Sequence, residues 1–250
     1  MRLGLATLAL HPRRVPAAAS PPSPPSPPPP PPPPPAAGAG VVGIASTPRS
    51  GTHADQTVAH DQGAGHGLLV LTVTRPQFGV AQTADATWKG TAMDLVLNTS
   101  DGSSQANDPL LFVHGLQSPA SGAGTIDLAF NAAHSDSLVV VVETEGADLD
   151  GIVAAYEREG TTSDTTLSGT VTGTGLALAI GGIARGTTAS WSAGWDEILE
   201  DKSDTGTATS TLTASVASRR AGGETPATVT FADADDGRVL GLLVLPDAGA

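Results

Sequence analysis

The sequence has no cysteine, few aromatic residues (3%) and no long hydrophobic run. The lack of cysteine excludes disulfide bridges, thiolate metal sites and a cysteine nucleophile. Its apolar runs are much shorter than the ~18 to 20 residues that a membrane-spanning helix needs. The chain also lacks a G-x-S-x-G elbow, an H-E-x-x-H motif and a Walker loop. We therefore predict a non-enzymatic protein with no cofactor and no membrane partner.

Basic residues are few and unevenly placed along the chain. Residues 1–50 contain four arginines (Arg2, Arg13, Arg14 and Arg49) and no acid, a formal charge of +4; because the whole chain carries −13, residues 51–250 carry −17. A body this acidic repels nucleic acid and anionic membrane surfaces. We expect neither of them as a partner of the domain.

A proline-rich stretch, PPSPPSPPPPPPPPP at residues 21–35, divides the chain into two unlike parts. Proline fixes φ and has no amide donor, so this stretch can neither join a sheet nor propagate an α-helix. We expect a stiff polyproline II rod that rises about 3.1 Å per residue, roughly 45 Å in all. Residues 36–40, AAGAG, should add a flexible joint. The predicted linker is therefore 21–40.

The head, residues 1–20, is expected to be an extended peptide, and its leucine-rich start, MRLGLATLAL, contains one arginine. It begins like a signal peptide, but its apolar stretch is short. His11, Pro12, Arg13 and Arg14 follow at once, which is atypical of a signal peptide. We favour an uncleaved docking peptide over a signal peptide, which stays the alternative. The candidate docking residues are Arg2, Leu3, Leu5, Leu8 and Leu10.

Residues 41–250 show short apolar or alternating runs at regular intervals, separated by Gly, Asp, Ser and Thr. Continuous runs such as LLVLTVT (68–74) and SLVVVVET (137–144) are typical of strands buried on both faces. Residues 84–98 read as a hairpin with its turn at Lys89-Gly90, whereas 48–67 reads mainly as turns. The only local helix candidate is WDEILEDK at 195–202. The sequence predicts one all-β domain, a single antiparallel β-sandwich of about twelve strands with jelly-roll or immunoglobulin-like topology.

Three of the six histidines, His53, His60 and His66, lie within fourteen residues. A metal site would need them to converge together with a carboxylate. We interpret them as loop histidines in water, and His114 as a hydrogen-bonded residue of an apolar strand. The acidic stretches ADLDG (147–151) and ADADDG (232–237) resemble calcium loops only in part, and we interpret both as plain turns. No metal site is predicted.

The few large aromatic side chains are the candidate ligand-binding residues. Trp88, Tyr156, Trp191 and Trp195 are the residues able to stack on a sugar ring. A sandwich with only four phenylalanines also needs large side chains inside, so burial in the core is the competing interpretation for each of them.

Four segments carry a resemblance to known proteins: DQTVAHDQGAGHGLLVLTVT (55–74), ATWKGTAMDLVL (86–97), GAGTIDLAF (122–130) and SLVVVVETEGAD (137–148). In order and spacing they resemble a sandwich module of bacterial surface proteins and phage virion proteins, over about residues 55–245. The head resembles the short start that precedes linkers in virion appendage proteins of phages and gene transfer agents. Neither resemblance brings a catalytic residue.

These resemblances imply a structural or adhesive protein on a virion surface, as a capsid decoration, head spike or tail fibre. The head would dock into capsid or tail proteins, and the domain would meet the host surface, for example a glycan. Many copies on a symmetric particle would supply avidity, so we expect a homo-oligomer or repeating array. The alternative is a secreted or cell-surface carbohydrate-binding module with a proline-rich spacer.

Overall fold

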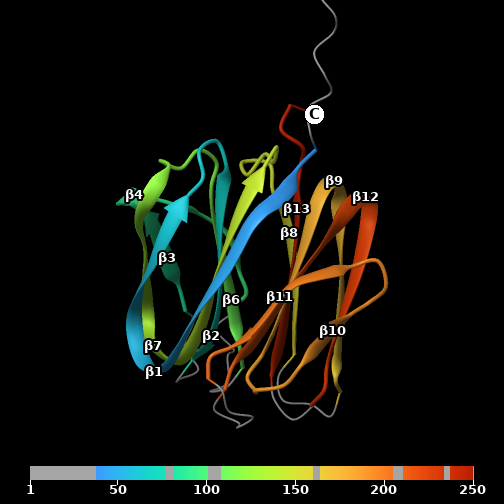
Figure 1. Ribbon diagram of the computed structural model, residues 1–250. Coiled ribbons are helices and arrows are strands. Elements are labelled where there is room, and N and C mark those ends of the chain that lie inside the picture. The colour runs from blue at the N-terminus through green and yellow to red at the C-terminus, as the bar shows by residue number, and fades with distance from the viewer. Residues whose placement is uncertain are drawn as a thin grey trace, which may run out of the picture. The chain divides into compact units, whose positions relative to one another are not determined.

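The computed structural model describes residues 38–76, 82–100, 108–159, 164–204, 211–233 and 237–249. By its contacts the chain divides into Met1–Pro35 and Ala36–Ala250, and all described residues belong to the second unit. Every regular element in them is a β-strand, and the strands pair antiparallel in two sheets (Figure 1). The predicted all-β antiparallel sandwich is confirmed. No described helix is long and apolar enough to cross a membrane.

The first sheet has seven strands in the order β4-β3-β7-β2-β6-β5, with β1 also paired to β7. The bounds are β1 Gly40–Gln62, β2 Gly67–Pro76, β3 Ala84–Trp88, β4 Thr91–Ala92, β5 Asp94–Asn98, β6 Leu110–Leu116 and β7 Gly122–Glu145.

The second sheet has six strands in the order β10-β12-β9-β13-β8, with β11 also paired to β12. The bounds are β8 Val153–Glu159, β9 Thr166–Ile183, β10 Ala189–Trp191, β11 Asp196–Lys202, β12 Thr213–Phe231 and β13 Arg238–Leu245. The predicted number of about twelve strands is close to the thirteen of the structure.

Each sheet folds back over itself, because its longest strands bend and take their partners with them. The first half of β7 pairs with β3 and its second half with β2, while β1 follows β7 along its whole length. In the second sheet, β9 and β12 stay paired from Thr213↔Ile183 to Thr230↔Thr166. Figure 1 shows β1 and β7 turning together at one end of the first sheet. The sandwich therefore has a folded-over limb outside each of its two central faces.

Three hydrophobic clusters fill the spaces between these layers. On β2, Leu69 and Leu71 face the second sheet, whereas Leu68 and Val70 face the folded limb that carries Trp88. The central strand β13 is divided in the same way, with alternate residues in the cluster between the sheets (Val239, Leu243 and Leu245) and in the outer cluster (Leu240, Leu242 and Val244). Strands that lie between two cores have no solvent face. This explains why their sequences are continuous apolar runs rather than alternating ones.

Glycines with positive φ lie at the bends. On β9, Gly175 has a φ of 137°, and on β12 Gly223, which lies opposite Gly173 of β9, has a φ of 130°. On β1 the bend falls at Gly51, with a φ of 83°, where the register with β7 shifts. A Cβ on Gly175 would lie only 2.1 Å from the carbonyl oxygen of Leu245. Here the chain needs both the unusual φ and the missing side chain.

One local prediction is wrong, and one needs a smaller correction. Residues 48–62 belong to the long strand β1, because pairing with β7 outweighs their turn-forming residues. Within 195–202, the only local helix candidate of a sequence without a convincing helix, residues Asp196–Lys202 form strand β11, paired to β12. The linker ends before residue 40, since Ala39 is buried and β1 begins at Gly40. The predicted hairpin with its turn at Lys89-Gly90 is confirmed by β3 and β4.

We predict that Gly175→Ala lowers the free energy of unfolding by at least about 2 kcal/mol, because the new methyl group meets the Leu245 carbonyl and φ is unfavourable for alanine. Urea unfolding followed by tryptophan fluorescence measures it. Gly222 is the control position, because a Cβ added there would have no atom within 4 Å and its φ is not positive. Gly222→Ala should change stability by less than about 0.5 kcal/mol. Equal losses in both variants would contradict the assignment of Gly175 to the bend.

Candidate functional site

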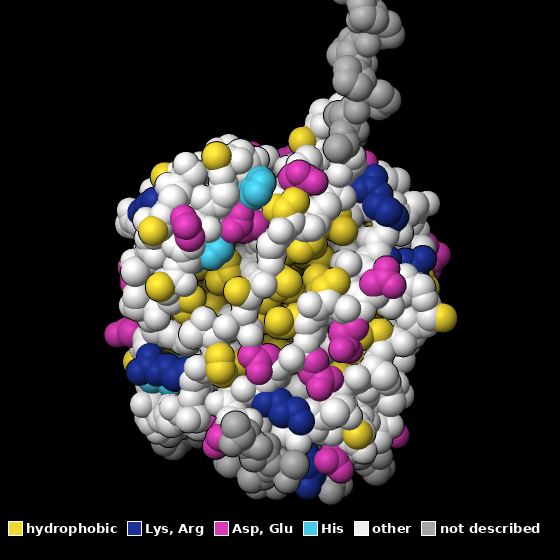
Figure 2. All heavy atoms as spheres, in the orientation of Figure 1, with side chains coloured by type: hydrophobic (Ala, Val, Ile, Leu, Met, Phe, Trp, Pro, Cys, Tyr) yellow, Lys and Arg dark blue, Asp and Glu magenta, His cyan; other side chains and the backbone are white. Residues whose placement is uncertain are grey.

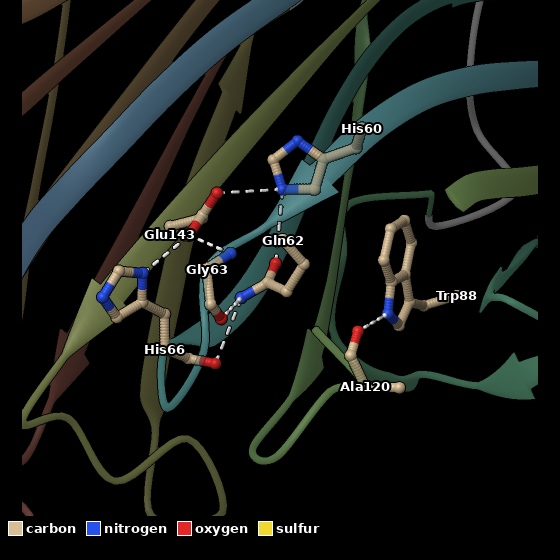
Figure 3. Close-up of polar contacts among 7 residues, drawn as sticks. All are labelled: His60, Gln62, Gly63, His66, Trp88, Ala120 and Glu143. Atoms are coloured by element: carbon tan, nitrogen blue, oxygen red, sulfur yellow. Dashed lines mark hydrogen bonds and ion pairs between the residues drawn. The ribbon is translucent and has the colours of Figure 1, made fainter. Parts of the chain in front are cut away.

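The turn between β1 and β2 gathers a group of polar side chains around Glu143 of β7. Two histidines flank this turn, His60 near the end of β1 and His66 just before β2. Glu143 lies opposite Gly43 of β1 and Leu68 of β2 in the central part of the sheet. His60 belongs to the folded limb instead, opposite Gly124. The group, shown in Figure 3, therefore connects the central sheet to its own folded limb.

Both oxygens of Glu143 have a nitrogen partner: Oε1 forms an ion pair with His60, and Oε2 accepts hydrogen bonds from His66 and Gly63. His60 Nε2 lies 3.1 Å from Oε1, and His66 Nδ1 lies 2.7 Å from Oε2. The backbone N–H of Gly63 donates to the same Oε2 at 2.9 Å. An ionised carboxylate can only accept, so the two ring nitrogens that face it must carry protons. Glu143 thereby fixes the tautomer of each histidine whenever its ring is neutral.

Gln62 completes the turn from the other side. Its Oε1 lies 3.2 Å from His60 Nε2, and its Nε2 donates to the carbonyl of His66 at 3.2 Å. Gln62 is buried, whereas the side chains of His60 and His66 keep 14% and 30% of their surface exposed. The turn is thus held by side-chain bonds on both sides, with two histidines at its surface.

The surroundings of Glu143 act on its pKa in opposite directions. Burial, the largest single effect, raises the pKa, because it disfavours the charged form. The hydrogen bonds from His66 and Gly63 and the charges of His60 and His66 lower it, and together they outweigh burial. The net result is a pKa below the usual value, so the carboxylate is ionised at neutral pH.

The interpretation of His60 and His66 as free loop histidines is wrong, because both bond Glu143. This partner lies 77 residues from His66 in the sequence, so spacing alone could not reveal it. One signal was present: an acid that closely follows four valines in a buried strand needs a partner. In the described ranges no group of three His, Asp or Glu side chains is placed to hold a metal ion.

A second histidine group lies inside the first sheet. His134 is fully buried, packs edge-on against Phe130 with ring centroids 4.3 Å apart, and has no hydrogen-bond partner for either nitrogen among the described residues. Burial, helped by the nearby His53, lowers its pKa to about 4. His53 lies 2.9 Å from the Ser137 hydroxyl and 2.7 Å from the Gly51 carbonyl, and burial lowers its pKa as well. These histidines are neutral parts of the core, which the sequence did not indicate.

His114 fits its predicted role as a hydrogen-bonded strand residue. It is buried in β6, and its Nε2 lies 3.0 Å from the carbonyl of Ala84. In the acidic stretch 147–151, Asp148 accepts from the backbone N–H groups of Asp150 and Gly151, as an aspartate does when it closes its own turn. The second acidic stretch, 232–237, lies partly outside the described residues.

The tryptophans are largely inside the domain. Trp88 is 0% exposed, so it has no ring face for a sugar; its indole N–H donates to the Ala120 carbonyl at 2.7 Å, and its ring meets the edge of His60. Trp195 is also buried and donates to the Pro226 carbonyl. Trp191 is partly buried, 6.3 Å from Trp195 between ring centroids, and bonds Ser215. A stacking role for Trp88 therefore conflicts with its burial.

Tyr156 differs from the tryptophans, because it lies on the edge strand β8 and is 41% exposed. Trp88 packs in the first sheet and the pair Trp191 and Trp195 in the second, so the structure does not bring the four predicted residues into one site. Ligand binding by Tyr156 or Trp191 stays a prediction. The predicted docking residues Arg2, Leu3, Leu5, Leu8 and Leu10 lie outside the described residues.

No protein family, no curated protein and no solved structure matches this chain. The likeness of its segments to virion and surface modules therefore stays a prediction.

We predict that Glu143→Gln lowers the free energy of unfolding by about 1 to 3 kcal/mol at pH 7, because the hydrogen bonds from His66 and Gly63 to a charged acceptor are lost. A carboxylate with a lowered folded-state pKa stabilises the fold above its unfolded pKa, and this contribution disappears as pH falls through the folded value. The variant should therefore lose less stability than the parent below about pH 4.5. Urea titrations at pH 3.5 and 7 measure both effects. Glu145→Gln, at an exposed position of the same strand, should behave like the parent.

A buried neutral histidine makes stability fall with acid, because only the unfolded chain binds the proton between the unfolded pKa and the folded one. For His134 this range extends from about pH 6.5 down to about 4. We predict that His134→Leu reduces the loss of stability over that range by up to about 3 kcal/mol. Thermal unfolding at pH 7.5, 6 and 4.5 measures it. Ala129→Leu, which places a leucine at an exposed position of the same strand and removes no titratable group, is the matched control. Parallel pH profiles for His134→Leu and the parent would contradict the assignment.

Proposed function

We propose that this chain is a non-enzymatic display protein of a phage-like particle. Residues 1–20 dock into capsid or tail proteins, the proline-rich stretch 21–35 is a spacer, and the β-sandwich is presented to the host surface. The sequence supports these three roles, because a basic head, a proline spacer and an acidic domain are clearly separated along it.

The observation that carries the proposal is the way the domain holds its own first residues. Ala39, only a few residues after the prolines, is buried, and its N–H donates to Asp247 Oδ1 at 2.6 Å. Arg220 donates to both oxygens of Asp247, at 2.9 and 2.6 Å, and to the Ala39 carbonyl at 3.1 Å. A bidentate arginine pair of this kind is geometrically specific. The first described residues of the domain are therefore fastened to its C-terminal segment.

The strand that follows is suited to carry a load from a spacer. β1 begins at Gly40, directly after the fastened residues, and is paired to β7 from Glu145 to Gly122. The inter-strand hydrogen bonds of such a long ladder share any force that pulls on the strand. A tethered domain needs this resistance at its attachment point, whereas a freely diffusing enzyme does not.

The polar group around Glu143 also favours a structural role. Both carboxylate oxygens are occupied by His60, His66 and Gly63. A general base must be free to accept a proton from a substrate. Glu143 could do so only after it had released the turn that it holds.

A second candidate is a secreted or cell-surface carbohydrate-binding module, which the exposed ring of Tyr156 favours. Such a module would lose its head on secretion, so the two candidates differ in their mature N-terminus. The particle protein should keep Met1 as its N-terminus, whereas the secreted protein should begin after Ala19. Peptide mass spectrometry of the natural protein distinguishes them.

We predict that deleting residues 1–20 abolishes incorporation into particles, because the docking peptide is then missing. Particles from the cells that encode the chain are purified on a density gradient and probed for it by immunoblot. Deleting the six prolines at 27–32 shortens the spacer by roughly 19 Å and leaves the head intact, so incorporation should persist. Unchanged incorporation of the first variant would refute the docking role.

A further inference from the structure

Two edge strands, β1 and β11, lie next to each other on one side of the sandwich without forming a ladder. β1 pairs with β7 and β11 pairs with β12, and in the described residues neither has a second partner strand. Ser46 of β1 donates to Asp201 of β11 and bridges the two. The backbone edges of both strands therefore border a seam between the two sheets (Figure 1).

The floor of this seam is apolar and partly open. Val41 and Ile44 of β1 and Ile198 and Leu199 of β11 pack against the central core while remaining only partly buried. Figure 2 shows a hollow with hydrophobic side chains at its bottom on the face where β1 and β11 lie. At Pro48 and residues 200–204 the seam contains a cavity of about 540 Å³. We call this the β1–β11 groove.

The rim of the groove on the β11 side is acidic. Glu200, Asp201 and Asp204 line the cavity together with a single base, Lys202. Asp196 and Glu197 precede them on the same strand. Carboxylates around an apolar floor attract cations and repel acidic surfaces. A second copy of this domain, whose residues 51–250 carry −17, is thus a poor occupant.

Both walls of the groove are edges of β-strands, which an extended chain can pair with. An extended peptide can add to an exposed strand edge through main-chain hydrogen bonds, while alternate side chains enter pockets. Pro48 on β1 and the irregular register at Glu197 and Leu199 on β11 limit indiscriminate pairing. Charge then selects among the segments that fit.

From these features we propose that the β1–β11 groove binds an extended segment of a partner protein in which aliphatic residues alternate with lysine or arginine. The aliphatic side chains cover Ile44 and Leu199, and the basic ones pair with Asp201 and its acidic neighbours. The groove does not include residues 1–20, which dock in the function proposed above, so either proposal can fail alone.

The test uses the full chain and a fluorescein-labelled nonapeptide of alternating lysine and valine. Fluorescence anisotropy should show saturable binding that weakens with added salt, as expected for charged contacts. Leu199→Lys and Asp201→Asn should each weaken it at least tenfold. The same peptide with glutamate in place of lysine should not bind.

Matched controls come from the edge strand β5, where Asp94 and the exposed Leu95 offer the same chemistry outside the groove. Asp94→Asn and Leu95→Lys should change affinity less than twofold. In the unaltered protein, peptide should shift amide resonances of Val41–Thr47 and Asp196–Lys202. Equal losses in both sets of variants, shifts elsewhere, or no binding of the lysine peptide would overturn the proposal.

Discussion

The structure depends on burying its central strands on both faces. β2 and β13 each contribute side chains to two hydrophobic clusters, and neither strand has a face left for water. A simple two-layered sandwich would leave one face of each sheet exposed. Here the bends of β1, β7, β9 and β12 fold a limb over each outer face, so that a domain with few aromatic residues still buries a large aliphatic core. Burial of the leucines and valines therefore depends on the glycines that allow these strands to bend.

This arrangement explains which parts of the fold the sequence could predict. The apolar runs at 68–74 and 137–144 were recognisable, because a strand between two cores has to be apolar at every position. The turn at Lys89-Gly90 was recognisable from local chemistry. The length of β1 was not, since residues 48–62 contain turn formers and become a strand only through pairing with β7. The acidic strand β11 was not among the expected strands either, because its partner β12 lies elsewhere in the sequence.

The candidate site shows the limit of sequence reasoning more sharply. The sequence shows that His60 and His66 flank one turn. Their role depends on Glu143, which β7 places beside them. Aromatic residues that looked suited to ligands were needed inside instead, as the burial of Trp88 shows. The Trp88 and His60 rings pack edge to face, so the buried tryptophan and the bonded histidine are parts of one arrangement. Pairing across a sheet, rather than spacing along the chain, decides such roles.

Attachment and recognition meet on the same strand. The first residues of β1 follow Ala39, which Asp247 and Arg220 fasten to the end of the chain, and the next ones form one wall of the β1–β11 groove. A segment bound in that groove would therefore add bonds to the strand that carries a pull from the spacer. Because β1 is already paired to β7 on its other side, the bound segment would enclose it between two neighbours. Binding at the groove and resistance at the attachment point would then reinforce each other, since both act on the backbone of β1.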